Sequence, residues 1–277
     1  MESKRLFDCI EHQLTNFPNE AMFAAKENGS WRKYPTTEVA STVNSLSAGL
    51  LSLGLSGHDF TPEGSDKIAI ISSNRPEWLM ADMATQQIGV IWVPVYPTTN
   101  PLELTFILND ASVQYMFASN QELYNKVMSI KDKVPCLKEV YTFDRIEGAK
   151  HWSELCLQDA DLLQQVDVIK KTIPVEQVAT FIYTSGTTGT PKGVMLTHHN
   201  IYFNLQSGKN SFPFPDKPDQ KVLSFLPLNH IFEKVASYIY MYSGMSIYYA
   251  ESMETIGDNL KEVSPDAFST VPRLLEK

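Results

Sequence analysis

Residues 178–193 read VATFIYTSGTTGTPKG, an apolar run that changes at Thr184 into glycines and hydroxyl side chains. Residues 178–183 carry no charge and are rich in β-branched and aromatic side chains, which predicts a buried strand. In the segment that follows, glycine lets the backbone approach a ligand closely, and successive N–H groups can point into one concavity. A single lysine, Lys192, adds a compact positive charge. The stretch therefore predicts a strand that delivers a phosphate-binding loop.

The donors in this loop suit a polyphosphate. Charge-assisted hydrogen bonds contribute roughly 1.5 to 3 kcal/mol each, so a few of them can hold a triphosphate without a broad basic surface. The candidate phosphate-binding residues are Thr184, Ser185, Gly186, Thr187, Thr188, Gly189 and Lys192. A flexible polar linker is another interpretation of glycines and threonines. A linker needs neither a buried strand before it nor one lysine between Pro191 and Gly193, so we prefer the phosphate loop.

The Walker loop, GxxxxGK[ST], is the second alternative. Counted from Gly186, Lys192 falls at the Walker lysine position. However, Pro191 replaces the second glycine, and Gly193 replaces the serine or threonine that would hold magnesium. These mismatches exclude an ordinary P-loop NTPase.

Composition sets limits on the class of protein. The chain has 277 residues, of which 43% are hydrophobic and 20% charged, so it can bury the core of one large domain or of two. Its formal net charge of -9 leaves no broad basic face, which argues against nonspecific binding to nucleic acid or to anionic lipid. Any phosphate that the protein binds must therefore be held by a small local group of hydrogen-bond donors and positive charges.

Cysteine usage and the apolar segments indicate a reducing compartment. Cys9, Cys136 and Cys156 are odd in number and far apart, which argues against a disulfide framework or a zinc site. Residues 1–14 lack the apolar stretch of a signal peptide, and the apolar run at 88–96 is too short to span a bilayer. We expect a cytoplasmic protein, and we leave peripheral contact with a membrane surface open.

Strand and helix patterns alternate along most of the chain. Strands are expected at residues 67–71, 90–96, 114–118, 140–143, 178–183, 222–226, 245–249 and 267–271. Helices are expected at residues 36–53, 76–88, 122–130, 200–207 and 255–263, and another begins at Asn100. Such alternation implies parallel pairing, so the predicted fold class is α/β, with largely parallel sheets flanked by helices. The polar stretch 144–172 gives no assignment.

A proline-rich segment divides this pattern. Residues 211–219 contain Pro213, Pro215 and Pro218 and can form neither a helix nor a central strand. We expect residues of about 65–210 to form a first α/β subdomain. Residues 1–60 and 215–277 then form part of a second one.

Two motifs carry a resemblance to a known superfamily. Residues 183–201, YTSGTTGTPKGVMLTHHNI, resemble the AMP-binding signature of the adenylate-forming enzymes, which include acyl-CoA synthetases, luciferases and peptide-synthetase adenylation domains. Residues 226–233, LPLNHIFE, resemble the next motif, whose histidine lies close to the acyl carboxylate and the nucleotide. The resemblance implies catalytic roles for Lys192 and His230 and a magnesium-ligand role for Thr184. We expect His198 and His199 only to begin a helix.

Further segments are similar to long-chain fatty acyl-CoA synthetases. They are NRPEW at 74–78, VPVYPT at 93–98, residues 247–263 and residues 268–277. This resemblance implies a ligase that uses ATP and Mg²⁺ to convert a long-chain fatty acid to acyl-AMP, and then coenzyme A to form acyl-CoA. A relative that acts on an aryl or medium-chain acid remains the alternative. Some members carry a tryptophan gate after the motif histidine, where this chain has Glu233 and Lys234.

The resemblance also implies parts that residues 1–277 do not contain. These are the magnesium-binding glutamate, the ribose-binding aspartate, the hinge and the C-terminal domain with its adenylation lysine. We therefore expect an incomplete N-terminal AMP-binding domain that is inactive or nearly so by itself. A binding-only role and self-association, including a homodimer, stay open.

The stretch 235–249 is rich in apolar and aromatic residues. Its tyrosines are Tyr238, Tyr240, Tyr242, Tyr248 and Tyr249. They could line a channel for an alkyl chain or pack in the core. We favour packing, because aromatic side chains at such spacings usually fill cores.

Overall fold

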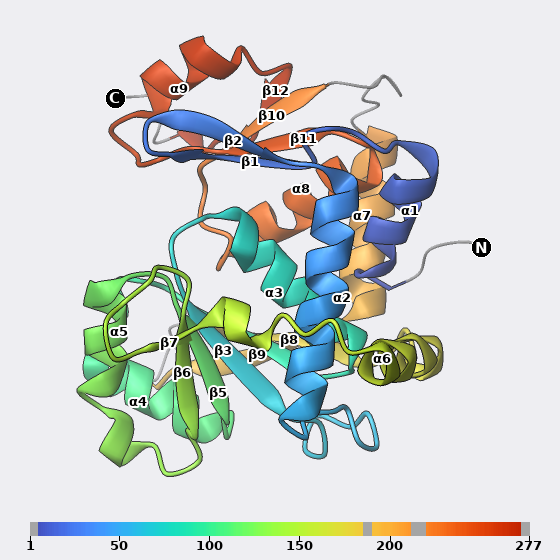
Figure 1. The fold of residues 1–277 in the computed structure, drawn as a ribbon. Coiled ribbons are helices and arrows are strands. Elements are labelled where there is room, and N and C mark those ends of the chain that lie inside the picture. Colours follow the sequence, from blue (N-terminus) through green and yellow to red (C-terminus); the bar gives the residue numbers. More distant parts are fainter. Residues whose placement is uncertain (1–4, 185–189, 212–219, 273–277) are drawn as a thin grey trace. The chain divides into compact units, whose positions relative to one another are not determined.

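The computed structural model describes residues 5–184, 190–211 and 220–272 (Figure 1). The described chain divides into two compact units, which we treat separately. The seven-strand unit comprises Thr42–Ser73 and Glu77–Asn200, and the five-strand unit comprises Met1–Ser41, Asn74–Pro76 and Ile201–Lys277. Helices α2 (Thr36–Ser52) and α7 (His198–Ser211) each contribute residues to both units.

The seven-strand unit is built on a largely parallel sheet. Its strands are β3 (Lys67–Ile71), β4 (Ile91–Val95), β5 (Tyr115–Ala118), β6 (Glu139–Thr142), β7 (Lys150–His151), β8 (Val178–Thr184) and β9 (Lys192–Thr197). They lie in the order β7-β6-β5-β3-β4-β8-β9. Every neighbouring pair is parallel except β8 and β9, which are antiparallel. The predicted α/β class with largely parallel pairing is confirmed.

Helices pack against this sheet because the strands are apolar on both faces. All residues of β3 and β4 are buried, as expected for central parallel strands. The helices of this unit are α3 (Pro76–Gln87), α4 (Pro101–Asp110), α5 (Gln121–Met128) and α6 (Ala160–Thr172), with 3-10 turns η1 (Lys131–Lys133) and η2 (Trp152–Leu155). The side chain of Asn100 accepts a hydrogen bond from the backbone N of Glu103 over 3.0 Å, which confirms the predicted start of α4.

The polar stretch that gave no sequence assignment is anchored on the part of α2 that belongs to this unit. The backbone N of Leu157 donates to the carbonyl of Ser45 over 3.0 Å. The Cα of Gly49 faces the carbonyl of Leu155 so closely that an added Cβ would overlap that oxygen. Glycine therefore lets α2 and η2 approach each other at this point, and α6 follows.

The five-strand unit has a smaller mixed sheet. Its strands are β1 (Phe23–Glu27), β2 (Ser30–Tyr34), β10 (Lys221–Ser224), β11 (Ser246–Tyr249) and β12 (Ala267–Phe268), in the order β12-β10-β11-β1-β2. Besides its share of α2 and α7, this unit contains α1 (Asp8–Asn16), α8 (Ile231–Tyr242) and α9 (Ile256–Val263). Strands β1, β10, β11 and β12 pair in parallel, whereas β1 and β2 form an antiparallel hairpin.

The β1–β2 hairpin turns at Asn28 and Gly29. Both residues have positive φ angles, 51° and 79°. An Asn-Gly pair suits a tight hairpin because both residues tolerate this conformation. The sheet then extends from β1 to β11, where Phe23 lies opposite Ile247 in parallel register.

The tyrosines of α8 and β11 pack within the five-strand unit. Tyr238, Tyr240, Tyr248 and Tyr249 are buried. The ring of Tyr242 stacks on that of His12, with 4.0 Å between the ring centroids. The expectation that these side chains serve packing is confirmed. No helix within the described ranges has the length and apolarity needed to cross a bilayer.

Candidate active site

The candidate phosphate loop joins two antiparallel strands of the seven-strand unit. Thr184, the last residue of β8, lies opposite Lys192, the first residue of β9. Residues directly opposite each other in an antiparallel pair project their side chains to the same face of the sheet. Both side chains are exposed. The predicted ligands Ser185, Gly186, Thr187, Thr188 and Gly189 lie outside the described residues, so of that set the structure places Thr184 and Lys192.

Sheet topology puts this loop at the carboxyl edge of the parallel strands. β8 pairs in parallel with β4, and β4 pairs in parallel with β3. These strands therefore all end on the same side of the sheet. The chain adds β4 on one side of β3 and β5 on the other, so the strand order reverses at β3. In α/β proteins, ligands bind outside the carboxyl ends of the strands near such a reversal.

Tyr183 anchors the end of β8, one residue before the loop. Its ring packs against the core cluster that includes Leu104 and Ile107 of α4. Its hydroxyl donates a hydrogen bond to Oδ2 of Asp110 over 2.6 Å. Burial, and then the neighbouring Asp110 carboxylate, raise the pKa of Tyr183 well above its ordinary value. The phenol therefore stays protonated and remains a hydrogen-bond donor.

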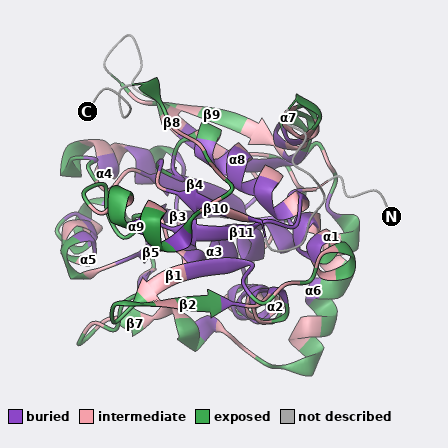
Figure 2. Cartoon of the chain, turned by 90° about the horizontal axis from the view of Figure 1, so that it is seen from above, coloured by how far each residue is buried: buried purple, intermediate pink, exposed green. Residues whose placement is uncertain are grey.

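Gly193 follows Lys192 and lies opposite Tyr183 in the β8–β9 register. A Cβ on Gly193 would lie 3.1 Å from Cζ of the Tyr183 ring. Because that ring is also held by Asp110, the position favours glycine. Strand β9 alternates between exposed and intermediate residues in Figure 2, and Val194 and Met195 are among the exposed ones.

The end of β9 leads directly into α7. Thr197 and Asn200 exchange hydrogen bonds between side chain and backbone N, each over 3.1 Å. His198 is buried, and Nδ1 of His199 lies 2.6 Å from Oε1 of Glu176. The two histidines open α7, which confirms their expected place at a helix start.

His230 belongs to the five-strand unit. It is the N-cap of α8, and its Nδ1 accepts a hydrogen bond from the backbone N of Phe232 over 3.2 Å. An accepting Nδ1 places the proton of a neutral imidazole on Nε2. The side chain is exposed, so its Nε2–H can reach a ligand. The carboxyl end of β10 delivers the turn that carries His230, as it would for a site residue in a parallel sheet.

Sequence reasoning missed several residues that support these positions. They are Asp110 beneath the loop strand and Asn74, Ser224 and Glu233 around the His230 turn. Asn74 lies in a segment already similar to the synthetases, which was the available signal. Nothing local marks Asp110, because it meets Tyr183 across 73 residues of sequence.

A magnesium ion would need oxygen donors from the protein. The described part of the chain contains no group of three or more His, Cys, Asp or Glu side chains that could hold a metal. Magnesium bound with a nucleotide takes most of its ligands from phosphates and water and uses one or two protein oxygens. The exposed hydroxyl of Thr184 fits such a single-ligand role.

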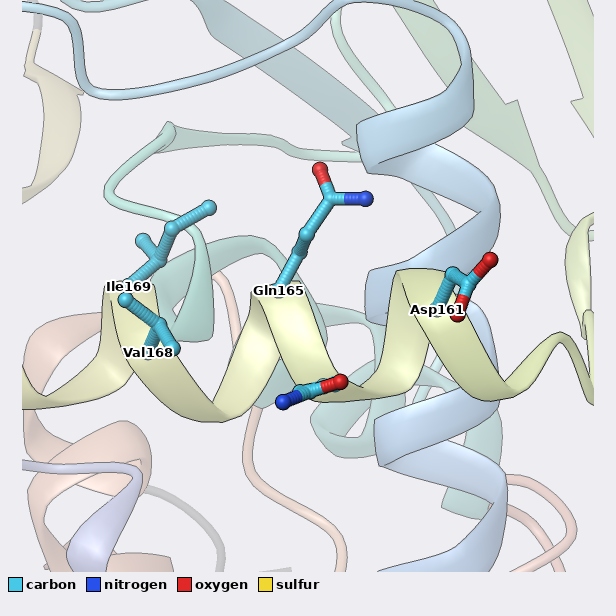
Figure 3. A pocket seen from close by; sticks show the side chains of 5 residues that line it. Asp161, Gln165, Val168 and Ile169 are labelled. Carbon is cyan, nitrogen blue, oxygen red and sulfur yellow. The ribbon is translucent and has the colours of Figure 1, made fainter.

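A surface hollow lies along α6 in the seven-strand unit (Figure 3). It is lined by Asp161, Gln164, Gln165, Val168 and Ile169. All five residues belong to one helix, and Asp161 is the one ionisable group among them. This lining provides no pair of acid and base groups and no cation for phosphate, so it does not compete with the loop as a candidate active site.

The sheet, its flanking helices and the loop at its carboxyl edge define an α/β protein with a candidate phosphate site. The chain belongs to the family of AMP-binding enzymes, whose model matches residues 10–277. It is 27% identical over 276 residues to the long-chain-fatty-acid–CoA ligase FadD15 of Mycobacterium bovis, with 97% of this chain and 43% of the relative covered.

A second curated relative agrees on this family, and a solved structure shares the fold. The peroxisomal long chain acyl-CoA synthetase 6 of Arabidopsis thaliana is 31% identical, over 98% of this chain and 39% of its own length. The solved anthranilate CoA ligase AuaEII, in complex with anthranoyl-AMP, superposes with a TM-score of 0.79 at 18% identity, covering 98% of this chain and 50% of that one. The chain thus spans about two-fifths of the length of these curated relatives.

Proposed function

We propose that the whole protein activates a long-chain fatty acid with ATP and transfers the acyl group to coenzyme A. The observation that carries this proposal is the β8–β9 hairpin, which brings Thr184 and Lys192 together at the carboxyl edge of a parallel sheet. The relatives named as long-chain fatty acid ligases support the substrate class.

The chemistry assigns a role to each placed residue. A carboxylate oxygen of the fatty acid attacks the α-phosphorus of ATP, and the bond from that phosphorus to the bridging oxygen breaks. Pyrophosphate leaves with the electron pair, and negative charge grows on it. Lys192 stabilises that charge, and the loop hydroxyls and N–H groups hold the phosphates in line. The thiol of coenzyme A then attacks the acyl carbon, and AMP leaves.

His230 and Thr184 take separate roles in this proposal. The Nε2–H of His230 is free to donate to a carboxylate or phosphoryl oxygen, since Nδ1 is already used by the backbone N of Phe232. The hydroxyl of Thr184 would give one oxygen to the magnesium that enters with ATP. When bound, that ion neutralises phosphate charge.

Residues 1–277 on their own should make little or no acyl-CoA. By resemblance, the magnesium-binding glutamate, the ribose-binding aspartate and the adenylation lysine belong to segments not found in these residues. Alignment of the reacting groups accounts for a large part of such rate enhancements. The absence of these residues should therefore lower the turnover rate more than the affinity for phosphate. The polypeptide 1–277 would then hold nucleotide weakly through its loop.

Substrate choice is tested in the whole protein by following acyl-AMP formation with acetate, octanoate, palmitate and anthranilate. Each buried methylene stabilises by about 0.8 kcal/mol, so kcat/KM should rise several-fold per carbon until the acyl site is full. Anthranilate is included because an anthranilate ligase shares the fold. A preference for anthranilate or acetate over palmitate would overturn the long-chain proposal.

The polypeptide 1–277 is tested separately with ATP, magnesium, palmitate and coenzyme A, measuring pyrophosphate and thioester. We expect no turnover above that of the Lys192→Ala variant prepared in the same way, which controls for contaminating host synthetase. Turnover at the rate of a full-length relative, lost in Lys192→Ala, would show that the missing segments are not needed.

A further inference from the structure

The turn that carries His230 is held by one side chain from a distant part of the sequence. Nδ2 of Asn74 donates to the carbonyl of Leu226 over 2.7 Å, and Oδ1 of Asn74 accepts from the backbone N of Leu228 over 3.0 Å. The two bonds lie on either side of Pro227, whose carbonyl accepts the backbone N of His230 over 2.9 Å. All of these residues belong to the five-strand unit.

A second set of bonds ties this turn to the helix that follows it. Nδ2 of Asn74 also lies 3.3 Å from Oγ of Ser224, the last residue of β10. That hydroxyl donates to Oε1 of Glu233 over 2.6 Å. Glu233 stands in the first turn of α8, three residues after His230. The side chains of Asn74, Ser224 and Glu233 thus connect the end of β10, the turn and the start of α8.

Glu233 is an unusual residue for the inside of a protein. It is 1% exposed, and its Oε2 has no hydrogen-bond partner within the described ranges. Burial raises the pKa of Glu233 to about 8, against a lowering by the Ser224 hydrogen bond. A helix N-terminus favours a negative charge, but only by about 0.3 to 2 kcal/mol, which is less than the cost of burying an unpaired carboxylate. The group is therefore a neutral acid at pH 7.

Two ionisable residues of α8, Tyr240 and Lys234, bear on the charge state of this carboxyl. Tyr240 lies about two turns further along α8 and interacts with this carboxyl electrostatically. The hydroxyl of Tyr240 shares a 2.6 Å hydrogen bond with Oγ of Ser269. Burial raises the pKa of Tyr240 to about 12, so it is uncharged near neutral pH. Lys234 is buried beside Glu233 in sequence and has interactions of its own.

We propose that Glu233 is a positioning residue: through Ser224 and Asn74 its buried side chain fixes the turn that sets the orientation of the His230 imidazole. The role of that imidazole at the acyl carboxylate rests on the proposed function above, whereas the geometric role of Glu233 does not. Glu233 touches no substrate in this arrangement. It acts only by keeping the backbone N of Phe232 and the turn before His230 in fixed positions relative to each other.

The test compares the wild-type polypeptide with Glu233→Gln and Glu233→Ala by NMR. Glutamine can accept the Ser224 hydrogen bond as the neutral carboxyl does, whereas alanine cannot. Two readouts report on the turn: amide hydrogen exchange at Leu228 and Phe232, and the tautomer of His230 from its imidazole ¹⁵N shifts. We expect Glu233→Gln to match the wild type. Glu233→Ala should raise exchange at both amides by about tenfold, the scale of one lost hydrogen bond, and mix the His230 tautomers.

Two further variants keep the test decisive. Ser237→Ala removes a buried hydroxyl of α8 that has no hydrogen-bond partner within the described ranges, so it should leave both readouts unchanged. Asn74→Ala acts at the half-buried end of the network and should reproduce the effect of Glu233→Ala if that variant fails to fold. Unchanged exchange and an unchanged tautomer in a folded Glu233→Ala or Asn74→Ala would overturn the proposal.

Rates of acyl-AMP formation by variants of the whole protein distinguish the positioning role of Glu233 from the proposed catalytic role of His230. There, Glu233→Ala should lower kcat for acyl-AMP formation by about tenfold with KM for ATP unchanged, and Glu233→Gln should restore kcat. If His230→Ala leaves the rate unchanged while the NMR effects persist, the catalytic role of His230 fails and the positioning role of Glu233 stands. If the NMR effects are absent, the positioning role fails whatever the rates are.

Discussion

The hydroxyl of Tyr183 and the carboxylate of Asp110 meet over 2.6 Å and join the strand before the phosphate loop to the last residue of α4. Between them they fix the end of β8. The ring of Tyr183 also fills the space in which a side chain at position 193 would lie. The ring that Asp110 holds in place thus also explains why glycine is favoured after Lys192.

Removing this hydrogen bond should weaken the unit measurably. Tyr183→Phe is expected to lower the free energy of unfolding by about 1 kcal/mol, because a hydrogen bond to a charged acceptor is lost while Asp110 remains hydrated. Urea denaturation measures the change. Tyr124→Phe is the matched control, since Tyr124 packs against the same core cluster. An equal loss in both variants would mean that the Asp110 contact contributes nothing.

A side chain at position 193 should disturb the same contact. Valine favours strands, yet Gly193→Val is expected to lower the free energy of unfolding by about 1 to 3 kcal/mol, since its Cβ meets the Tyr183 ring. The check is a double-mutant cycle with Tyr183→Ala. The combined loss should be smaller than the sum of the two single losses. A stabilised Gly193→Val protein would show that the ring moves aside freely.

Lys192 should matter for polyphosphate binding. Inorganic tripolyphosphate serves as the probe, and calorimetry on the polypeptide gives the affinity. Lys192→Ala is expected to weaken binding by about ten- to hundredfold, the scale of one charge-assisted hydrogen bond. In the whole protein the same change should slow acyl-AMP formation by roughly a hundredfold. Lys171→Ala, which removes an exposed lysine of α6, controls for net charge and should change neither value.

Glu233 should make stability depend on pH in a defined direction. Its pKa is about 8 in the folded protein against an ordinary value of 4.5, so between these values the folded state binds more protons than the unfolded state. The free energy of unfolding therefore falls as pH rises from 4.5 to 8, by up to about 4 kcal/mol from this group. Glu233→Gln lacks this titration. Denaturation at pH 5 and pH 9 should show a smaller loss in the variant, and equal losses would contradict the raised pKa.

The sequence predicted most strands and several helices of the seven-strand unit, because their signals are local. Buried parallel strands such as 67–71 are continuous apolar runs, and Asn100 marks a helix start through its own hydrogen bond to Glu103. The candidate phosphate loop was predicted from the same kind of local signal. Its glycines, threonines and Lys192 are consecutive.

The elements that were missed have weaker or misleading signals. The Asn28-Gly29 turn of the β1–β2 hairpin was a readable signal that was overlooked. Helix α6 lies in a polar stretch and buries one residue, Val166, so its periodicity is faint. Helix α8 carries Glu233 and Lys234 near its start, which suggest a surface, although both are buried. Burial of such groups depends on neighbours that local sequence does not reveal.

The sequence alone determined the α/β class and the family, and it predicted the loop residues and His230 as candidate site residues, because composition and short motifs indicate these without any long-range contact. Tertiary structure decided which distant residues support them. Asp110 meets Tyr183, and Asn74 meets Ser224, only after strands far apart in the sequence have paired. Hydrogen bonds act over about 3 Å, so their partners are chosen by the folded geometry and not by spacing along the chain.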